Sequence, residues 1–71
     1  MTVQEFERLK IDDVICSRFY ESEYYQITDT EVFGLQPKVC SGEQIETSKP
    51  KYIHIDRGSC DSWIIVGRMV K

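Results

Sequence analysis

The segment Tyr52-Ile53-His54-Ile55-Asp56 decides the fold, because its apolar and polar side chains alternate at every second position. Alternation with this period is typical of a β-strand that buries one face. The same rhythm recurs along the chain, in the pairs Val14/Cys16, Tyr25/Ile27, Phe33/Leu35 and Ile64/Val66. The sequence therefore predicts a mainly β domain whose loops and aromatic side chains carry its function.

Five short strands are predicted from this rhythm and from the turn residues between the apolar runs: Val14–Tyr20, Tyr24–Thr28, Val32–Leu35, Tyr52–Asp56 and Trp63–Val70. The last run is the most apolar, so we expect it to be the central strand. The polar stretch from 40 to 51 is predicted to be the main surface loop. Residues 2–5, Thr-Val-Gln-Glu, have the form of a capping box, which predicts a short helix over Val3–Lys10.

The pattern Leu9-Lys10-Ile11-Asp12-Asp13-Val14-Ile15 resembles the entry into SH3-like barrels of the Tudor and KOW type. In that entry an apolar residue, a short polar turn and an acidic residue precede the first strand, and the turn often holds a glycine. Asp12 takes the place of that glycine here. The resemblance implies a small five-stranded SH3-like barrel or curled antiparallel sheet with a short N-terminal helix. It favours a binding module and assigns no residue a role.

The length of 71 residues predicts a single domain, 1–71, with a small core. Hydrophobic residues make up 41% and charged residues 30% of the chain, which is typical of a folded rather than a disordered protein. The sequence contains no apolar run of membrane-spanning length, and its first residues lack the features of a signal peptide. Its three cysteines have no close spacing and make a poor disulfide framework. We therefore expect a cytoplasmic protein that does not associate with membranes.

The formal net charge of −3 is unevenly distributed along the chain. Residues 1–36 contain eight acidic and three basic side chains, whereas residues 37–71 contain four acidic and six basic ones. If the two halves form different surfaces, the molecule has an acidic side and a weakly basic side.

His54 is the only histidine, and alternation predicts that it lies beside Asp56 on one strand face. Such a pair can form a hydrogen bond, but no nucleophile lies at an informative spacing from it, so a solvated or cross-strand pair is favoured over a catalytic one. The cysteines and His54 lack the close pairs that fix two ligands in structural zinc sites. The glycines are isolated and form no phosphate-binding loop. We therefore expect no catalytic residue, no metal and no cofactor.

Five aromatic residues are candidates for a partner-binding surface: Tyr20, Tyr24, Tyr25, Tyr52 and Trp63. Exposed tyrosines near acidic side chains suit a cation, a peptide or a base. The alternative interpretation is that these rings fill the core and form a cross-strand ladder. Alternation along a strand places one residue of Phe19/Tyr20 and one of Tyr24/Tyr25 outside.

The favoured hypothesis is a non-enzymatic interaction or regulatory module that binds a protein partner through these aromatics or through a strand edge. In size it resembles small accessory or inhibitor proteins of bacteria and their phages. One alternative is a single-stranded nucleic-acid binder, and another is a small-ligand binder whose site is shared between subunits of a homo-oligomer. The nucleic-acid alternative uses Lys49, Lys51 and Arg57 with the aromatic residues Tyr52 and Trp63. The ligand alternative uses His54, Arg57 and Trp63. The negative net charge weakens long-range attraction to nucleic acid, so a protein partner is favoured.

Overall fold

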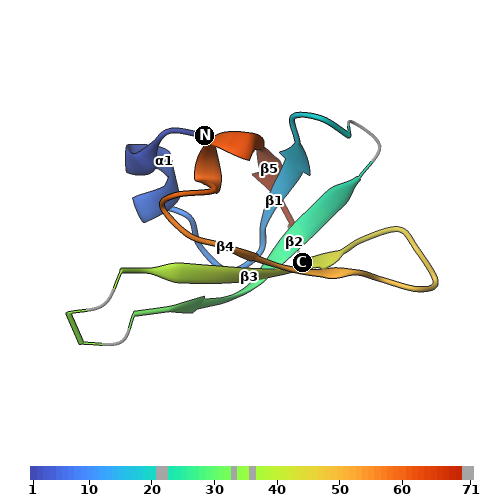
Figure 1. The fold of residues 1–71 in the computed structure, drawn as a ribbon. Coiled ribbons are helices and arrows are strands. Elements are labelled where there is room, and N and C mark those ends of the chain that lie inside the picture. The colour runs from blue at the N-terminus through green and yellow to red at the C-terminus, as the bar shows by residue number, and fades with distance from the viewer. Residues whose placement is uncertain (21–22, 33, 36, 70–71) are drawn as a thin grey trace.

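The computed structural model describes residues 1–20, 23–32, 34–35 and 37–69. Its elements are α1 (Val3–Glu7), β1 (Asp13–Ser17), β2 (Tyr24–Glu31), β3 (Val39–Gln44), β4 (Tyr52–Ile55), the 3₁₀ helix η1 (Cys60–Ser62) and β5 (Trp63–Arg68). The strands form one antiparallel sheet in the order β4-β3-β2-β1-β5 (Figure 1). The chain thus runs through four neighbouring strands and then returns, so that β5 pairs with β1.

The prediction of a mainly β fold is confirmed: five antiparallel strands and a short N-terminal helix form a curled sheet. Among the described residues β4 pairs only with β3, and β5 pairs only with β1. The sheet is therefore open, with β4 and β5 as its two edges. No helix in the described part of the chain is long and apolar enough to cross a membrane.

The N-terminal helix α1 begins at the predicted capping box. The Thr2 hydroxyl accepts a hydrogen bond from the Glu5 amide at 3.1 Å, and the Glu5 carboxylate accepts one from the Thr2 amide at 2.8 Å. The second bond lowers the pKa of Glu5. The helix ends at Glu7 and not at the predicted Lys10. Lys38 Nζ donates to the carbonyls of residues 6, 7 and 9 at its end.

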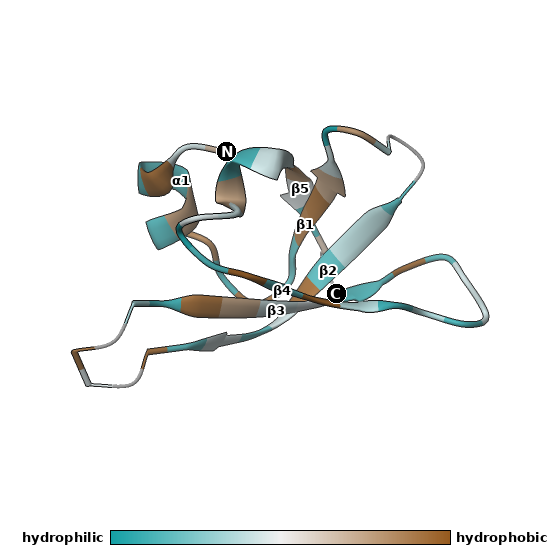
Figure 2. Ribbon diagram, viewed as in Figure 1, coloured by the Kyte–Doolittle hydropathy of each residue, from teal (hydrophilic) through white to brown (hydrophobic). Residues whose placement is uncertain are grey.

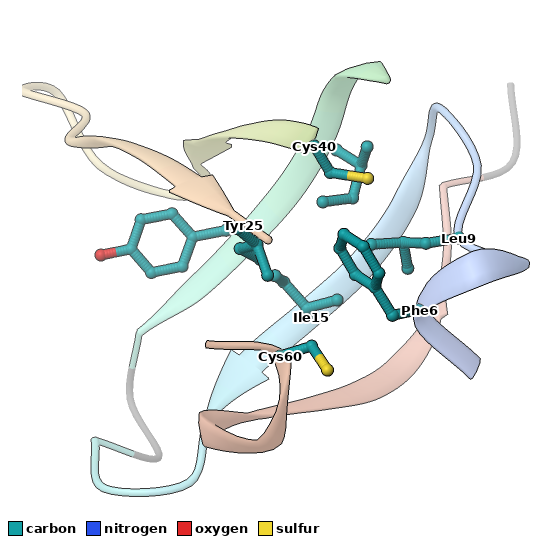
Figure 3. Close-up of a cluster of buried hydrophobic side chains, with 8 residues drawn as sticks. Phe6, Leu9, Ile15, Tyr25, Cys40 and Cys60 are labelled. Carbon is teal, nitrogen blue, oxygen red and sulfur yellow. The ribbon is translucent and has the colours of Figure 1, made fainter. Parts of the chain in front are cut away.

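The core lies between α1, η1 and the inner face of the sheet. It contains Phe6, Leu9, Ile15, Tyr25, Ile27, Cys40, Ile55 and Cys60. Hydrophobic residues concentrate in β1, whereas much of β2 is hydrophilic (Figure 2). Phe6 from α1 points toward Ile15 of β1, and Tyr25 directs its hydroxyl away from the cluster (Figure 3). A short helix is thus held in place by one aromatic ring that the sheet covers completely.

The predicted third strand is wrong, and the predicted main loop is too long, since only residues 45–51 of it connect two strands. Val32 and Leu35 are exposed, at 63% and 104%, in the connection between β2 and β3, while Phe33 lies outside the described residues. The third strand is β3, and all of it except Val39 lies in the stretch that the sequence assigned to a loop. Small residues allow β3 to pack closely, since a Cβ added at Gly42 would lie 3.2 Å from Cγ1 of Ile53. The apolar signal of β3 is therefore weak although its inner face is buried.

The predicted position of the last strand is also wrong, because β5 is an edge strand and not the central one. Trp63 and Ile65 pack toward the core, whereas Ile64 and Val66 are half exposed, at 47% and 50%. The strand ends at Arg68, and residue 70 lies outside the described residues. The apolar run of β5 suggested a central strand, but one face of this strand packs against the core and the other faces solvent.

Candidate functional site

The five aromatic candidates divide between the surface and the core. Tyr20, Tyr24 and Tyr52 are exposed, at 65%, 38% and 70%. Tyr25 is buried, and its ring meets that of partly buried Trp63 edge to face, with 5.3 Å between the centroids. Such a contact stabilises a core beyond the area that it buries. The structure therefore places three of the predicted side chains where a partner can reach them and two where they support the fold.

Tyr25 connects the core to the surface through its hydroxyl, which donates to Oε2 of Glu23 at 3.2 Å. Burial raises the pKa of Tyr25, and the negative charge and hydrogen bond of Glu23 raise it further. Glu23 in turn lies 3.7 Å from Nζ of Lys51, next to β4. The neutral Tyr25 phenol thus holds the Glu23 carboxylate, which contacts Lys51 immediately before β4.

The pair Phe19/Tyr20 departs from the expected alternation. Strand β1 ends at Ser17 and not at Tyr20, so both aromatic residues lie beyond the strand and both are exposed. Tyr24 and Tyr25 are inside β2 and follow the alternation, with Tyr25 in the core.

On the outer face of the sheet, Tyr52 and His54 of β4 lie opposite Glu43 and Ser41 of β3. The Ser41 hydroxyl and His54 Nδ1 are 3.0 Å apart, a hydrogen-bond distance. Asp29 of β2 lies opposite Ser41 on its other side. Over β3 and β4 the outer face is therefore polar and partly acidic, with Tyr52 as an exposed aromatic group.

His54 does not pair with Asp56 in the structure. The Asp56 carboxylate accepts hydrogen bonds from the amides of Gly58 and Ser59, at 2.9 and 3.0 Å, and from the Ser59 hydroxyl at 3.2 Å. A short aspartate side chain after a strand satisfies the turn that follows it more readily than a strand neighbour. His54 instead contacts Ser41, which the sequence analysis missed because residues 40–51 look like a loop.

The backbone of β4 is hydrogen-bonded on one side only. Gln44 donates its amide to the Lys51 carbonyl at 2.8 Å, so the backbone groups of Lys51 face β3. Because successive residues of a strand point their N–H and C=O groups to opposite sides, those of Ile53 and Ile55 also face β3. The backbone groups of Tyr52 and His54 then point away from the sheet. We call this side of β4 the β4 edge, and no described strand pairs with it.

The basic candidates flank the β4 edge instead of forming one patch. Lys49 and Lys51 precede β4, and both are exposed. Arg57 follows β4, and its Nε lies 3.5 Å from a Glu7 carboxylate oxygen of α1. His54 lies between these ends on the outer face. All four predicted residues thus lie in β4 or close to one of its ends.

The described residues include no group of three or more histidine, cysteine, aspartate or glutamate side chains arranged to hold a metal ion. All three cysteines are buried, and burial raises the pKa of the Cys40 thiol. A thiol in such surroundings stays protonated and unreactive at neutral pH.

No family model matches this chain, and no curated protein or solved structure matches it either.

Proposed function

We propose that this chain is a non-enzymatic protein-binding module with an SH3-like barrel, and that it binds an extended segment of a partner at the β4 edge. The observation that carries the proposal is the row of outward backbone groups on Tyr52 and His54. An exposed strand edge is a template for another strand, which pairs with it through main-chain hydrogen bonds. The exposed Tyr52 ring adds an aromatic contact next to that edge.

Two observations support the SH3-like assignment. The first four strands form a meander, and β5 returns to pair with β1. Asp12, in the turn before β1, has φ of 79°, the left-handed conformation that glycine adopts most easily. Its side chain accepts a hydrogen bond from Gln26 Nε2 at 2.7 Å. Asp12 therefore serves in the role of the glycine that this kind of entry often holds, because aspartate tolerates this conformation better than most residues.

A cytoplasmic location belongs to the same proposal. Cys40 and Cys60 are buried and form no disulfide. Buried thiols that stay reduced are typical of proteins in a reducing compartment.

Nucleic-acid binding is the weaker alternative. The net charge of −3 weakens the long-range attraction to nucleic acid. A base that stacks on Tyr52 would also bring its phosphates close to Glu43, the cross-strand neighbour of Tyr52. Both effects favour a protein partner.

Selection from a random-peptide display library tests the proposal. The wild-type chain should enrich extended peptides, and His54→Pro should lose them, because proline removes the outward N–H of residue 54. His54→Val is the matched control, since it removes the imidazole and keeps the N–H. Circular dichroism and thermal melting check that both variants are folded. The proposal is contradicted if wild type enriches no peptide, or if folded His54→Pro binds the enriched peptides as wild type does.

A further inference from the structure

Basic residues lie at both ends of the β4 edge. Over residues 49–57 the chain carries Lys49, Lys51 and Arg57 against one acidic residue, Asp56. The Asp56 carboxylate is engaged in the turn that follows β4, where it accepts three hydrogen bonds from residues 58 and 59. The segment around β4 is thus locally basic in a chain whose net charge is −3.

The two ion pairs of this segment leave its charge available to a partner. The Lys51–Glu23 and Arg57–Glu7 contacts are 3.7 and 3.5 Å long, and the two basic side chains are 70% and 57% exposed. Exposed pairs of this kind contribute little to stability, so a better-placed carboxylate can replace Glu23 or Glu7. Lys49 forms no ion pair with any described residue.

We propose that the segment bound at the β4 edge is acidic, with carboxylate side chains near both of its ends. This inference rests on the function proposed above. Basic residues lie at both ends of β4. Acidic residues at both ends of the segment can therefore contact them whether the segment runs parallel or antiparallel to β4. Opposite charges across an interface set the register and suppress wrong partners.

The middle of the bound segment should be neutral, with apolar residues on its inner side. On the inner side of the sheet its side chains would lie beside Ile53, which is partly buried against the core, so apolar residues fit there. On the outer side its neighbours would be Tyr52 and His54, with Glu43 and Asp29 farther in on the same face. Those two carboxylates disfavour acidic side chains at the central outer positions. The fitting segment is therefore acidic at its ends and neutral between them.

The same carboxylates distinguish a peptide from a nucleic acid. A single strand of RNA carries a phosphate at every nucleotide and would place charge along the whole edge. An acidic peptide places its charge only where Lys49, Lys51 and Arg57 lie, and it also pairs with the backbone groups of β4.

The composition of the selected peptides and the affinity of the best one test this inference. The enriched peptides should have a negative net charge, with Asp or Glu toward both ends. In a fluorescence-polarisation titration of the best peptide, Lys49→Glu should weaken binding by about three- to tenfold, and added salt should weaken the wild-type complex. Arg68→Glu, in β5 at the opposite edge of the sheet, makes the same change of charge away from β4 and should have an effect within about twofold.

Different outcomes separate this inference from the proposed function. Enriched peptides that lose binding to His54→Pro but show no acidic excess overturn the inference and leave the β4 edge as the binding site. Equal effects of Lys49→Glu and Arg68→Glu overturn it as well. A single-stranded RNA oligonucleotide that binds more tightly than every selected peptide would show that the basic residues serve nucleic acid instead. Failure to enrich any peptide contradicts the function itself.

Discussion

The two edges of the sheet differ in how far other residues of the chain cover them. At the β5 edge the amino group of Met1 donates to the carbonyls of Cys60 and Trp63, so residues from the N-terminus cover the beginning of this strand. The N-terminus, α1 and η1 lie together on one side of the sheet (Figure 1). At the β4 edge no described residue offers a comparable cover.

This difference shows that the apolar character of a strand does not decide which edge is available. Strand β5 is the more apolar strand, yet it is partly covered and exposes Ile64 and Val66 only on its outer face. Strand β4 is short and carries polar side chains on its outer face, as edge strands that resist aggregation commonly do. A partner that recognises backbone groups and charge therefore finds them at β4.

The largest expected effect separates the anchoring of the two edge strands. Ile55 of β4 is completely buried, whereas Ile64 of β5 is 47% exposed. Ile55→Ala should lower the free energy of unfolding by about 2–5 kcal/mol, and Ile64→Ala by less than about 1 kcal/mol. Urea denaturation followed by tryptophan fluorescence measures both values. Equal losses at the two positions would contradict the described packing of the strands.

Proline substitutions at adjacent residues distinguish the paired side of β4 from its open side. Ile53→Pro removes an N–H that faces Gly42 of β3 and should cost about 3 kcal/mol. His54→Pro removes an N–H that faces away and should cost less than about 1 kcal/mol. Ile53→Ala is the control that accounts for loss of the side chain. Greater destabilisation by His54→Pro than by Ile53→Pro in urea titrations would reverse the assigned sides.

A smaller effect depends on pH and involves Tyr25, which links Trp63 of β5 to Glu23 beside β4. Its pKa in the folded chain is raised above the ordinary value of 10.0, so the neutral phenol stabilises the fold below that pH. This stabilisation is lost as pH rises above about 10, when the unfolded chain ionises first. The urea midpoint of wild type should therefore fall more steeply with alkaline pH than that of Tyr25→Phe. Parallel curves for the two proteins would show that this phenol titrates alike in both states.

The sequence was sufficient for elements whose apolar residues are large. Tyr25 and Ile27 marked β2, Ile53 and Ile55 marked β4, and the Thr2 capping box marked the start of α1. Strand β3 was missed because its buried positions are Cys40 and Gly42, which give little apolar signal. The edge position of β5 was missed, because the exposure of one of its apolar faces arises only when the sheet is folded.

The candidate site could be predicted only in part. Alternation correctly gives one face of β4 to Tyr52 and His54, and the basic residues around them are visible in the sequence. The separation of Tyr25 and Trp63 from the surface depends on packing against α1 and η1, which come from distant parts of the chain. The contact of His54 with Ser41 depends on the register of β3, which the sequence left unassigned.

Amide hydrogen exchange along β4, measured by nuclear magnetic resonance without and with a saturating selected peptide, tests the central claim most directly. In the chain alone, the amides of Tyr52 and His54 should exchange quickly, while those of Ile53 and Ile55, which face β3, should exchange slowly. Bound peptide should slow exchange at Tyr52 and His54. Exchange at these two amides that stays fast under saturation, or that is already slow in the chain alone, would contradict binding at an open β4 edge.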